Sequence, residues 1–126
     1  MSGQTQKFTT SFAEKSKFSP GLRDYFEYRD LGFAEGSNGL VQAHVLRAVK
    51  PCPPGGTGRH THSVQFQMNY ILKGWMKFEL DGEVHTFQAG DAWMQPPNIK
   101  HELLDYSDDL ENIEVVMPAD FGTADA

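Results

Sequence analysis

The chain has 126 residues, the size of one ordinary domain, and 39% of them are hydrophobic, which suits a globular protein with one core. Its 17 acidic residues outnumber its 11 basic residues, and the formal net charge of -6 argues against nucleic acid or an anionic membrane as a partner. The single cysteine, Cys52, excludes an internal disulfide, and the polar amino-terminal stretch has no signal-peptide or membrane-spanning run, so we expect a cytoplasmic protein.

The amino-terminal segment, residues 1–20, is polar with scattered phenylalanines, and we expect it to form an arm outside the core. Residues 21–126 are expected to form a single domain. Near its start, residues 24–30 are aromatic-rich and typical of a strand, and a glycine-rich turn follows them. Residues 40–49 alternate apolar and polar side chains and predict another strand. Proline and glycine in residues 50–58 then predict an irregular loop.

The segment from residue 60 to residue 80 has the clearest pattern. Apolar residues occupy every second position in part of it: Phe66, Met68, Tyr70 and Leu72. After Gly74 a further strand is predicted at residues 75–80, and Asp81-Gly82 is a strong signal for a two-residue hairpin. More short strands are expected at residues 83–87, 92–95, 102–106 and 112–117. No window of about twelve residues has a helical period, so the sequence predicts an all-β sandwich or barrel.

Three of the five histidines occupy positions that suit a metal site. His60-Thr61-His62 can direct two imidazoles to one side of a strand, because alternate residues of a strand point the same way. His101 follows about forty residues later, after another predicted strand. Three converging imidazoles suit Zn, Fe, Ni, Cu or Mn. Such a histidine pair also arises by chance, so the surrounding residues matter.

Two longer motifs surround these histidines. The first is His60-Thr61-His62, four residues, Gln67, six residues and Gly74. The second is Gly90, five residues, Pro96, one residue, Asn98, two residues, His101, three residues and Asp105. Together they resemble, in register, the two motifs of the cupin family, and the resemblance extends over residues 40–117.

The resemblance implies a cupin double-stranded β-helix, a jelly-roll barrel, that holds one divalent transition metal (Fe, Mn, Ni or Zn). The implied ligands are His60, His62, Gln67 and His101. Three positions depart from the family pattern: Pro54 stands where the first motif begins with glycine, Asn98 replaces a turn glycine, and Asp105 replaces an asparagine. Asparagine tolerates the left-handed conformation, so the turn at Asn98 can be kept.

Gln67 stands where the family has a glutamate, which changes the charge of the site. Its neutral carbonyl oxygen would leave a divalent ion with its full charge and favour an anionic, bidentate ligand such as an enolate or α-hydroxy carboxylate. Alternatively, Gln67 does not ligate, and a three-histidine face keeps open positions, as in cupins that cleave C–C bonds with O₂. A third interpretation is that Gln67 bonds a backbone group. Because His62 and Gln67 are five residues apart, they converge only if the chain bends between them.

Three further residues are candidates for the wall of a substrate pocket: His44, Phe78 and Met94. His44 would be a polar group or proton carrier near the metal, or else a satisfied interior histidine. Phe78 and Met94 are apolar strand positions near the motifs and are equally compatible with plain core. Arg47 could hold a substrate carboxylate, although a solvated surface arginine is the simpler interpretation. The acidic residues late in the chain, Glu114 among them, are interpreted as a solvated loop.

The alternation in residues 66–72 also bears on oligomeric state. If Gln67, Asn69 and Ile71 face the metal, the apolar residues between them face outward, and an exposed apolar stripe needs a cover. Because cupins commonly dimerise through such faces, we expect a homodimer.

These observations predict a small metal-binding cupin with a small-molecule ligand. The first hypothesis is a non-haem, metal-dependent oxygenase of the dioxygenase type that acts on a small enolisable or hydroxy-acid compound. The alternatives are a non-catalytic small-molecule-binding cupin and a metal-dependent isomerase or lyase that works without oxygen. No clear general base accompanies the histidines, so the sequence assigns no catalytic residue.

Overall fold

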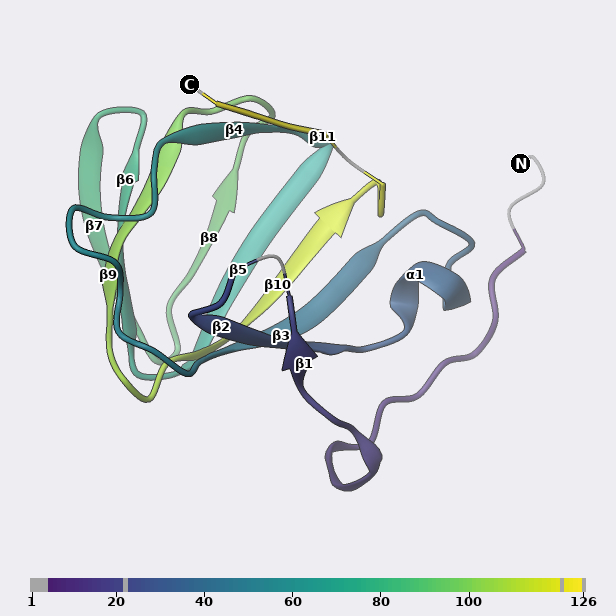
Figure 1. Ribbon diagram of the computed structural model, residues 1–126. Helices are drawn as coiled ribbons and strands as arrows, with labels where there is room; N and C mark the ends of the chain where they lie inside the picture. Colours follow the sequence, from purple (N-terminus) through teal and green to yellow (C-terminus); the bar gives the residue numbers. More distant parts are fainter. Residues whose placement is uncertain (1–4, 22, 121, 126) are drawn as a thin grey trace.

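The computed structural model describes residues 5–21, 23–120 and 122–125, and most of its regular structure is β-strand, arranged as two facing antiparallel sheets (Figure 1). The six-stranded sheet has the order β1 (Ser19–Pro20), β2 (Phe26–Asp30), β3 (Gln42–Ala48), β10 (Glu111–Met117), β5 (Phe66–Lys73) and β8 (Ala92–Gln95). The five-stranded sheet has the order β11 (Gly122–Asp125), β4 (His60–Ser63), β9 (His101–Tyr106), β6 (Trp75–Leu80) and β7 (Glu83–Gln88). Within these ranges, no helix is long and apolar enough to cross a membrane.

Strand β5 shows how side-chain alternation separates the inside of the barrel from the outside. Gln67, Asn69 and Ile71 are buried, whereas Tyr70 is 40% exposed and Leu72 is 44% exposed. Successive residues of a strand point to opposite faces, so the first three face the interior and the other two face away from it. The orientation predicted for this strand is therefore confirmed.

The hairpin predicted at Asp81-Gly82 joins β6 to β7. Leu80 pairs with Glu83, so the loop has two residues, and their φ angles of 50° and 88° are those that a tight primed turn needs. On its other side β6 pairs with β9, which places His101 opposite Leu80. The hairpin thus helps to fix the position of a predicted metal ligand.

An apolar cluster fills part of the space between the sheets. Its buried members are Tyr25, Phe26, Leu46, Ile71, Met76, Phe78, Leu103, Tyr106 and Leu110. The rings of Phe26 and Tyr106 lie 5.0 Å apart, and the side chain of Ile71 has no exposed surface. Because Met76 and Phe78 also line the internal cavity, the apolar core forms part of the cavity wall.

Three short elements differ from the sequence-based expectation. The glycine-rich turn contains the one-turn helix α1 (Phe33–Gly36), and the amino-terminal segment contains the 3-10 turn η1 (Ala13–Lys15). Elements of three or four residues are too short for a periodic pattern to reveal. Strand β11 follows Pro118, where the sequence predicts that the last strand ends, and it pairs with the distant strand β4. Such long-range pairing leaves no local signature.

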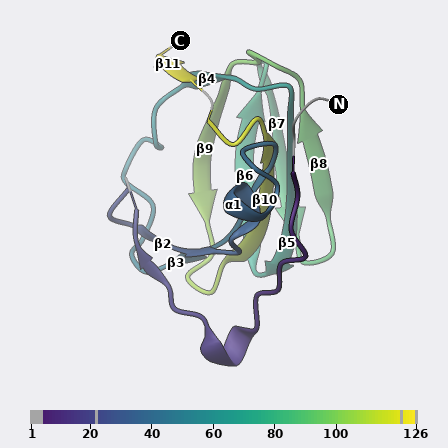
Figure 2. The same ribbon diagram turned by 90° about the vertical axis from the view of Figure 1, so that its right-hand side faces the viewer.

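Residues 5–18 lie outside the two sheets, with η1 below them in both views (Figures 1 and 2), whereas Ser19–Pro20 join the six-stranded sheet as the edge strand β1. Lys7 donates its backbone N–H to the carbonyl of Gly36 at 2.8 Å, which ties the segment to α1. Phe8 is 96% exposed and Phe12 is 56% exposed, so much of the aromatic surface here is not packed on this chain. That residues 1–20 act as an arm stays a prediction.

Candidate metal centre

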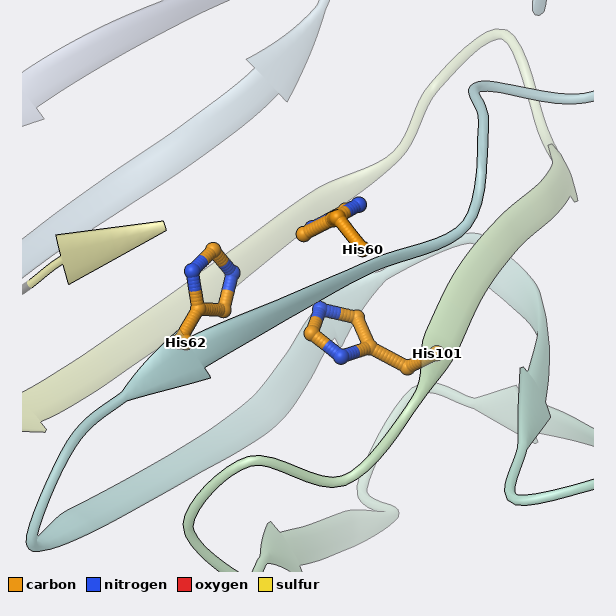
Figure 3. A group of neighbouring side chains, drawn as sticks. All are labelled: His60, His62 and His101. Atoms are coloured by element: carbon orange, nitrogen blue, oxygen red, sulfur yellow. The ribbon is translucent and has the colours of Figure 1, made fainter. Parts of the chain in front are cut away.

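Three histidines from two neighbouring strands meet inside the barrel (Figure 3). His60 and His62 lie on β4, and His101 is the first residue of β9, where it pairs with His60. The possible ligand atoms of the three imidazoles all lie within 4.8 Å of one another, and the ring centroids of His60 and His101 are 4.1 Å apart. The three imidazoles that the sequence singles out therefore do converge.

Backbone carbonyls orient two of these rings. Nδ1 of His60 donates to the carbonyl oxygen of Gly58 at 3.1 Å, and Nδ1 of His101 donates to that of Ile99 at 3.0 Å. A carbonyl oxygen can only accept, so each Nδ1 carries a proton, and Nε2 is the nitrogen that can ligate a metal. A partner of this kind is typical of metal-ligating histidines, because it fixes the tautomer and the direction of the ring.

The protonation states also suit a metal. Burial lowers the pKa of His62 to about 4, helped by the neighbouring charges of His101 and His60. Burial also lowers the pKa of His101, and outweighs the opposing effect of its hydrogen bond to Ile99. Both rings are therefore neutral at pH 7, the form in which imidazole binds a metal. The residues present fit a divalent transition ion, and among the described side chains no carboxylate belongs to this three-histidine cluster.

A cavity of about 520 Å³ lies between the two sheets, and the histidines line it. Its volume is that of a site for a small ligand. The inner face of the six-stranded sheet contributes a second group of polar side chains to the lining: His44, Gln67, Asn69, Gln95, Asn112 and Glu114. The metal-binding residues and this polar wall therefore come from different sheets.

The predicted pocket residues do not all reach this cavity. His44 and Phe78 line it. Met94 instead lies outside the lining, with a side chain that is 63% exposed. The reason is strand alternation on β8: Gln95, the next residue, is only 3% exposed and faces the interior, so Met94 faces outward.

Glu114 is a functional candidate that the sequence-based interpretation missed. Far from lying in a solvated loop, it lies on β10 inside the cavity, and its carboxylate accepts hydrogen bonds from His44 Nε2 at 2.8 Å and Gln67 Nε2 at 2.9 Å. Burial raises the pKa of Glu114, but the hydrogen bond and charge of His44, together with the Gln67 hydrogen bond, lower it overall. The side chain is an ionised carboxylate at neutral pH. The sequence does contain a signal for this position: Glu114 is two residues after Asn112 in the predicted strand, so both side chains lie on the same face.

Gln67 reaches the cavity because the chain changes sheets after His62. Strand β4 ends at Ser63 in one sheet, and β5 begins at Phe66 in the other. This crossing is the bend that the five-residue spacing requires, and it removes the conflict of strand parity. The amide nitrogen of Gln67 donates to Glu114 rather than to a backbone group, so the carbonyl Oε1 is the atom that Gln67 can present to an ion.

The turn of the second motif keeps its shape with an asparagine. Asn98 has a φ of 60°, in the left-handed region that its position in the motif implies. Its backbone N–H donates to the carbonyl oxygen of His62 at 2.9 Å. The turn that precedes His101 is thereby fixed to the strand that carries the other two histidines.

Two buried amides in the polar wall have an atom without a partner. Trp93 donates its indole N–H to Oε1 of Gln95 at 2.9 Å, which leaves Gln95 Nε2 with no hydrogen bond among the described residues. Asn112 donates to Oδ1 of Asn69 at 2.8 Å, and its own Oδ1 has no partner in the same part of the chain. Buried polar atoms are rarely unpaired, so these two are available to a ligand or a water molecule.

Three other polar or reactive residues, Arg47, His85 and Cys52, do not line the cavity. Arg47 pairs with Glu27 at 2.7 Å, and its guanidinium lies 3.9 Å from the ring centroid of Phe18, so it does not point into the cavity. His85 is exposed. Burial raises the pKa of the Cys52 thiol, which makes it a poor nucleophile.

Comparison with known proteins supports the fold. The model of the family described as "Cupin domain" matches residues 52–115. Two similar solved structures are KdgF from Halomonas sp. (18% identity, 87% of this chain and 94% of that chain, TM-score 0.71) and the polyketide cyclase RemF from Streptomyces resistomycificus (17% identity, 94% and 85%, TM-score 0.74). A third is the nucleoside dehydratase Pac13 (15% identity, 96% and 92%, TM-score 0.64). A search of curated proteins gave no match.

Proposed function

Since this chain belongs to the cupin family, we propose that it is a metal-dependent enzyme that moves protons on a small enolisable or hydroxy-acid compound, as an isomerase or lyase does. His60, His62 and His101 would hold the ion, and Oε1 of Gln67 is the candidate fourth ligand. When bound, a divalent ion supplies Lewis-acid chemistry, because it polarises a carbonyl or hydroxyl oxygen. The observation that carries the proposal is the ionised Glu114 carboxylate in the same cavity.

Glu114 has the properties of a general base. A carboxylate that remains ionised can accept a proton from a C–H or O–H group of the ligand. Its two oxygens are held in place by the hydrogen bonds from His44 and Gln67, so its orientation is set before a ligand arrives. His44, which also packs edge-on against Tyr28 at 5.4 Å, positions the carboxylate and stabilises its charge.

The polar wall would orient the ligand. Nε2 of Gln95 can donate to a ligand oxygen, and Oδ1 of Asn112 can accept from a ligand hydroxyl. A compound that carries both a carbonyl and a hydroxyl group would satisfy both atoms. The names of two structural neighbours, a polyketide cyclase and a nucleoside dehydratase, fit chemistry of this kind.

A metal-dependent dioxygenase is the second candidate. The observation that favours it is the three-histidine ligand set, which leaves coordination positions open for a substrate and for O₂. A non-catalytic binding protein is the remaining alternative. The three functions differ in what they need: proton transfer requires no oxygen, the oxygenase consumes it, and a binding protein gives no turnover.

The deciding experiment is hydrogen–deuterium exchange into small ketones, β-diketones and α-hydroxy acids, followed by NMR in D₂O with protein loaded separately with Zn, Mn, Fe or Ni. We expect metal-dependent exchange or product formation without oxygen. Glu114→Gln should lower its rate about 10²–10⁴-fold, the usual contribution of a general base, whereas Glu111→Gln on the same strand should not. Turnover only with O₂ uptake would establish the oxygenase instead, and no turnover under either condition would favour the binding protein.

We also propose that the protein is a cytoplasmic homodimer. Tyr70, Leu72 and Met94 are exposed on neighbouring strands β5 and β8, which supports an apolar outer face that another subunit would cover. Light scattering at micromolar concentration tests this, and a monomeric mass would contradict it.

A further inference from the structure

Arg23 brings a positive charge into the cavity that holds the histidines. It lies between β1 and β2, is half-buried, and lines the same cavity as His60 and His62. Its Nη1 donates to the carbonyl oxygen of Thr57 at 3.3 Å, and Thr57 also lines the cavity. This contact holds the guanidinium between the entrance to β2 and the loop that leads into β4.

Arg23 has no carboxylate partner among the described residues, which is also true of Arg29, whose guanidinium donates to Ser11 instead. Arg47 pairs with Glu27 and Arg59 pairs with Glu79, whereas no acidic side chain of residues 5–21, 23–120 lies within salt-bridge distance of Arg23. A guanidinium has five N–H donors, and the contacts of Arg23 with the Thr57 carbonyl and the Tyr25 hydroxyl leave other donors available. A partly desolvated cation with free donors is poised to receive an anion.

The other charges around the cavity do not neutralise Arg23. The Glu114 carboxylate already accepts from His44 and Gln67, and Asp30 accepts the backbone N–H of Gly32 at 2.7 Å. A divalent ion on three neutral histidines would add two further positive charges. The loaded cavity would therefore carry an excess of positive charge, which a neutral ligand would leave uncompensated.

We propose that Arg23 binds a carboxylate group of the substrate, so that the protein selects small enolisable or hydroxylated acids over the corresponding neutral compounds. The planar guanidinium matches a carboxylate through two parallel hydrogen bonds, and its contact with the Thr57 carbonyl helps to anchor it. This inference rests on the proposed function, because it assigns the charge of the substrate that the histidines and Glu114 would act on. Arg23 is thus a specificity-determining residue, distinct from Arg47, which the sequence suggests for this role.

The test compares two probes that differ only in charge: 2,4-dioxopentanoate and its methyl ester, titrated into zinc-loaded protein by calorimetry. We expect the wild type to bind the acid at least about tenfold more tightly than the ester, and Arg23→Met to reduce this ratio to about one. Arg23→Lys should keep part of the preference, since it retains the charge but not the paired donors. Arg47→Met, which removes an arginine that does not line the cavity, should keep the full preference.

If Arg23→Met keeps the preference for the acid, the inference is wrong. It is also wrong if the wild type binds neither 2,4-dioxopentanoate nor lactate more tightly than the corresponding methyl ester. Metal content and circular dichroism of Arg23→Met show that the variant is folded and loaded. If only the proposed function is wrong, the preference for the acid would still depend on Arg23, but the protein would show no metal-dependent exchange or turnover. A phosphate analogue that competes for the site as strongly as the acid would contradict the choice of a carboxylate.

Discussion

The lowered pKa of His62 predicts how the metal-free protein responds to acid. Folding keeps the pKa at about 4, against 6.5 for an unperturbed histidine, mainly because the ring is buried. In the unfolded chain His62 is therefore protonated below about pH 6.5, whereas in the folded chain it is protonated only below about pH 4. The free energy of unfolding should fall as the pH falls through this window, and the loss is complete only below the folded pKa. The difference between the two pKa values corresponds to about 3 kcal/mol in total, of which about 2 kcal/mol lies between pH 7 and pH 4.5.

Urea unfolding of the metal-free protein at several pH values measures this loss. The range above pH 4.5 separates the histidines from Glu114, whose lowered pKa affects stability only below the ordinary value of 4.5. His62→Gln removes the titrating group and should flatten the pH dependence by about 2 kcal/mol over this range. His85→Gln is the matched control, because His85 is exposed on the hairpin strand β7 and should leave the slope unchanged. Equal slopes for the wild type and His62→Gln would refute the reasoning.

Three further predictions follow from the geometry. His101→Ala should abolish binding of zinc, measured by elemental analysis, while the β-sheet circular dichroism remains, since the cluster loses one of its three ligands. Gln95→Leu removes a buried donor that has no described partner and also the oxygen that accepts the indole N–H of Trp93, so it should lower the free energy of unfolding by about 1 kcal/mol and weaken binding of 2,4-dioxopentanoate about five- to tenfold; Met94→Leu on the outer face is its control. Gly74→Ala should lower the free energy of unfolding by more than about 1 kcal/mol, measured in urea, because φ is 77° and the new Cβ would lie 2.1 Å from Ser107 Oγ.

The strands and the three histidines could be predicted from the sequence because both depend on local spacing. A period of two in residues 66–72, the Asp81-Gly82 turn and the pair His60 and His62 are all visible within a few residues. The fold family could also be predicted, because the sequence contains two motifs in the register that the family has. These features were confirmed where the structure describes them.

The polar wall could not be predicted with the same ease, because it depends on which strands become neighbours. Glu114 and Gln67 are 47 residues apart, and they meet only because β10 pairs with β5 in the middle of the six-stranded sheet. Gln95 reaches the same wall because β8 pairs with the other edge of β5. The prediction that Met94 lines the pocket was wrong by one residue. Gln95 lines it instead, because neighbouring positions on a strand face opposite sides.

In the proposed function, the two sheets have different roles, metal binding and proton transfer. The histidines lie on β4 and β9 of the five-stranded sheet, whereas Glu114 and its partners lie on strands of the six-stranded sheet. A hydrogen bond of 2.8 Å from His44, not the metal, holds the Glu114 carboxylate. Loss of the ion should therefore leave the base in position, and loss of the base should leave the ion bound. Gln67 links the two groups, because it is the candidate fourth ligand and its amide nitrogen also donates to Glu114. Substitution of Gln67 should therefore affect both the binding of the ion and the position of the base.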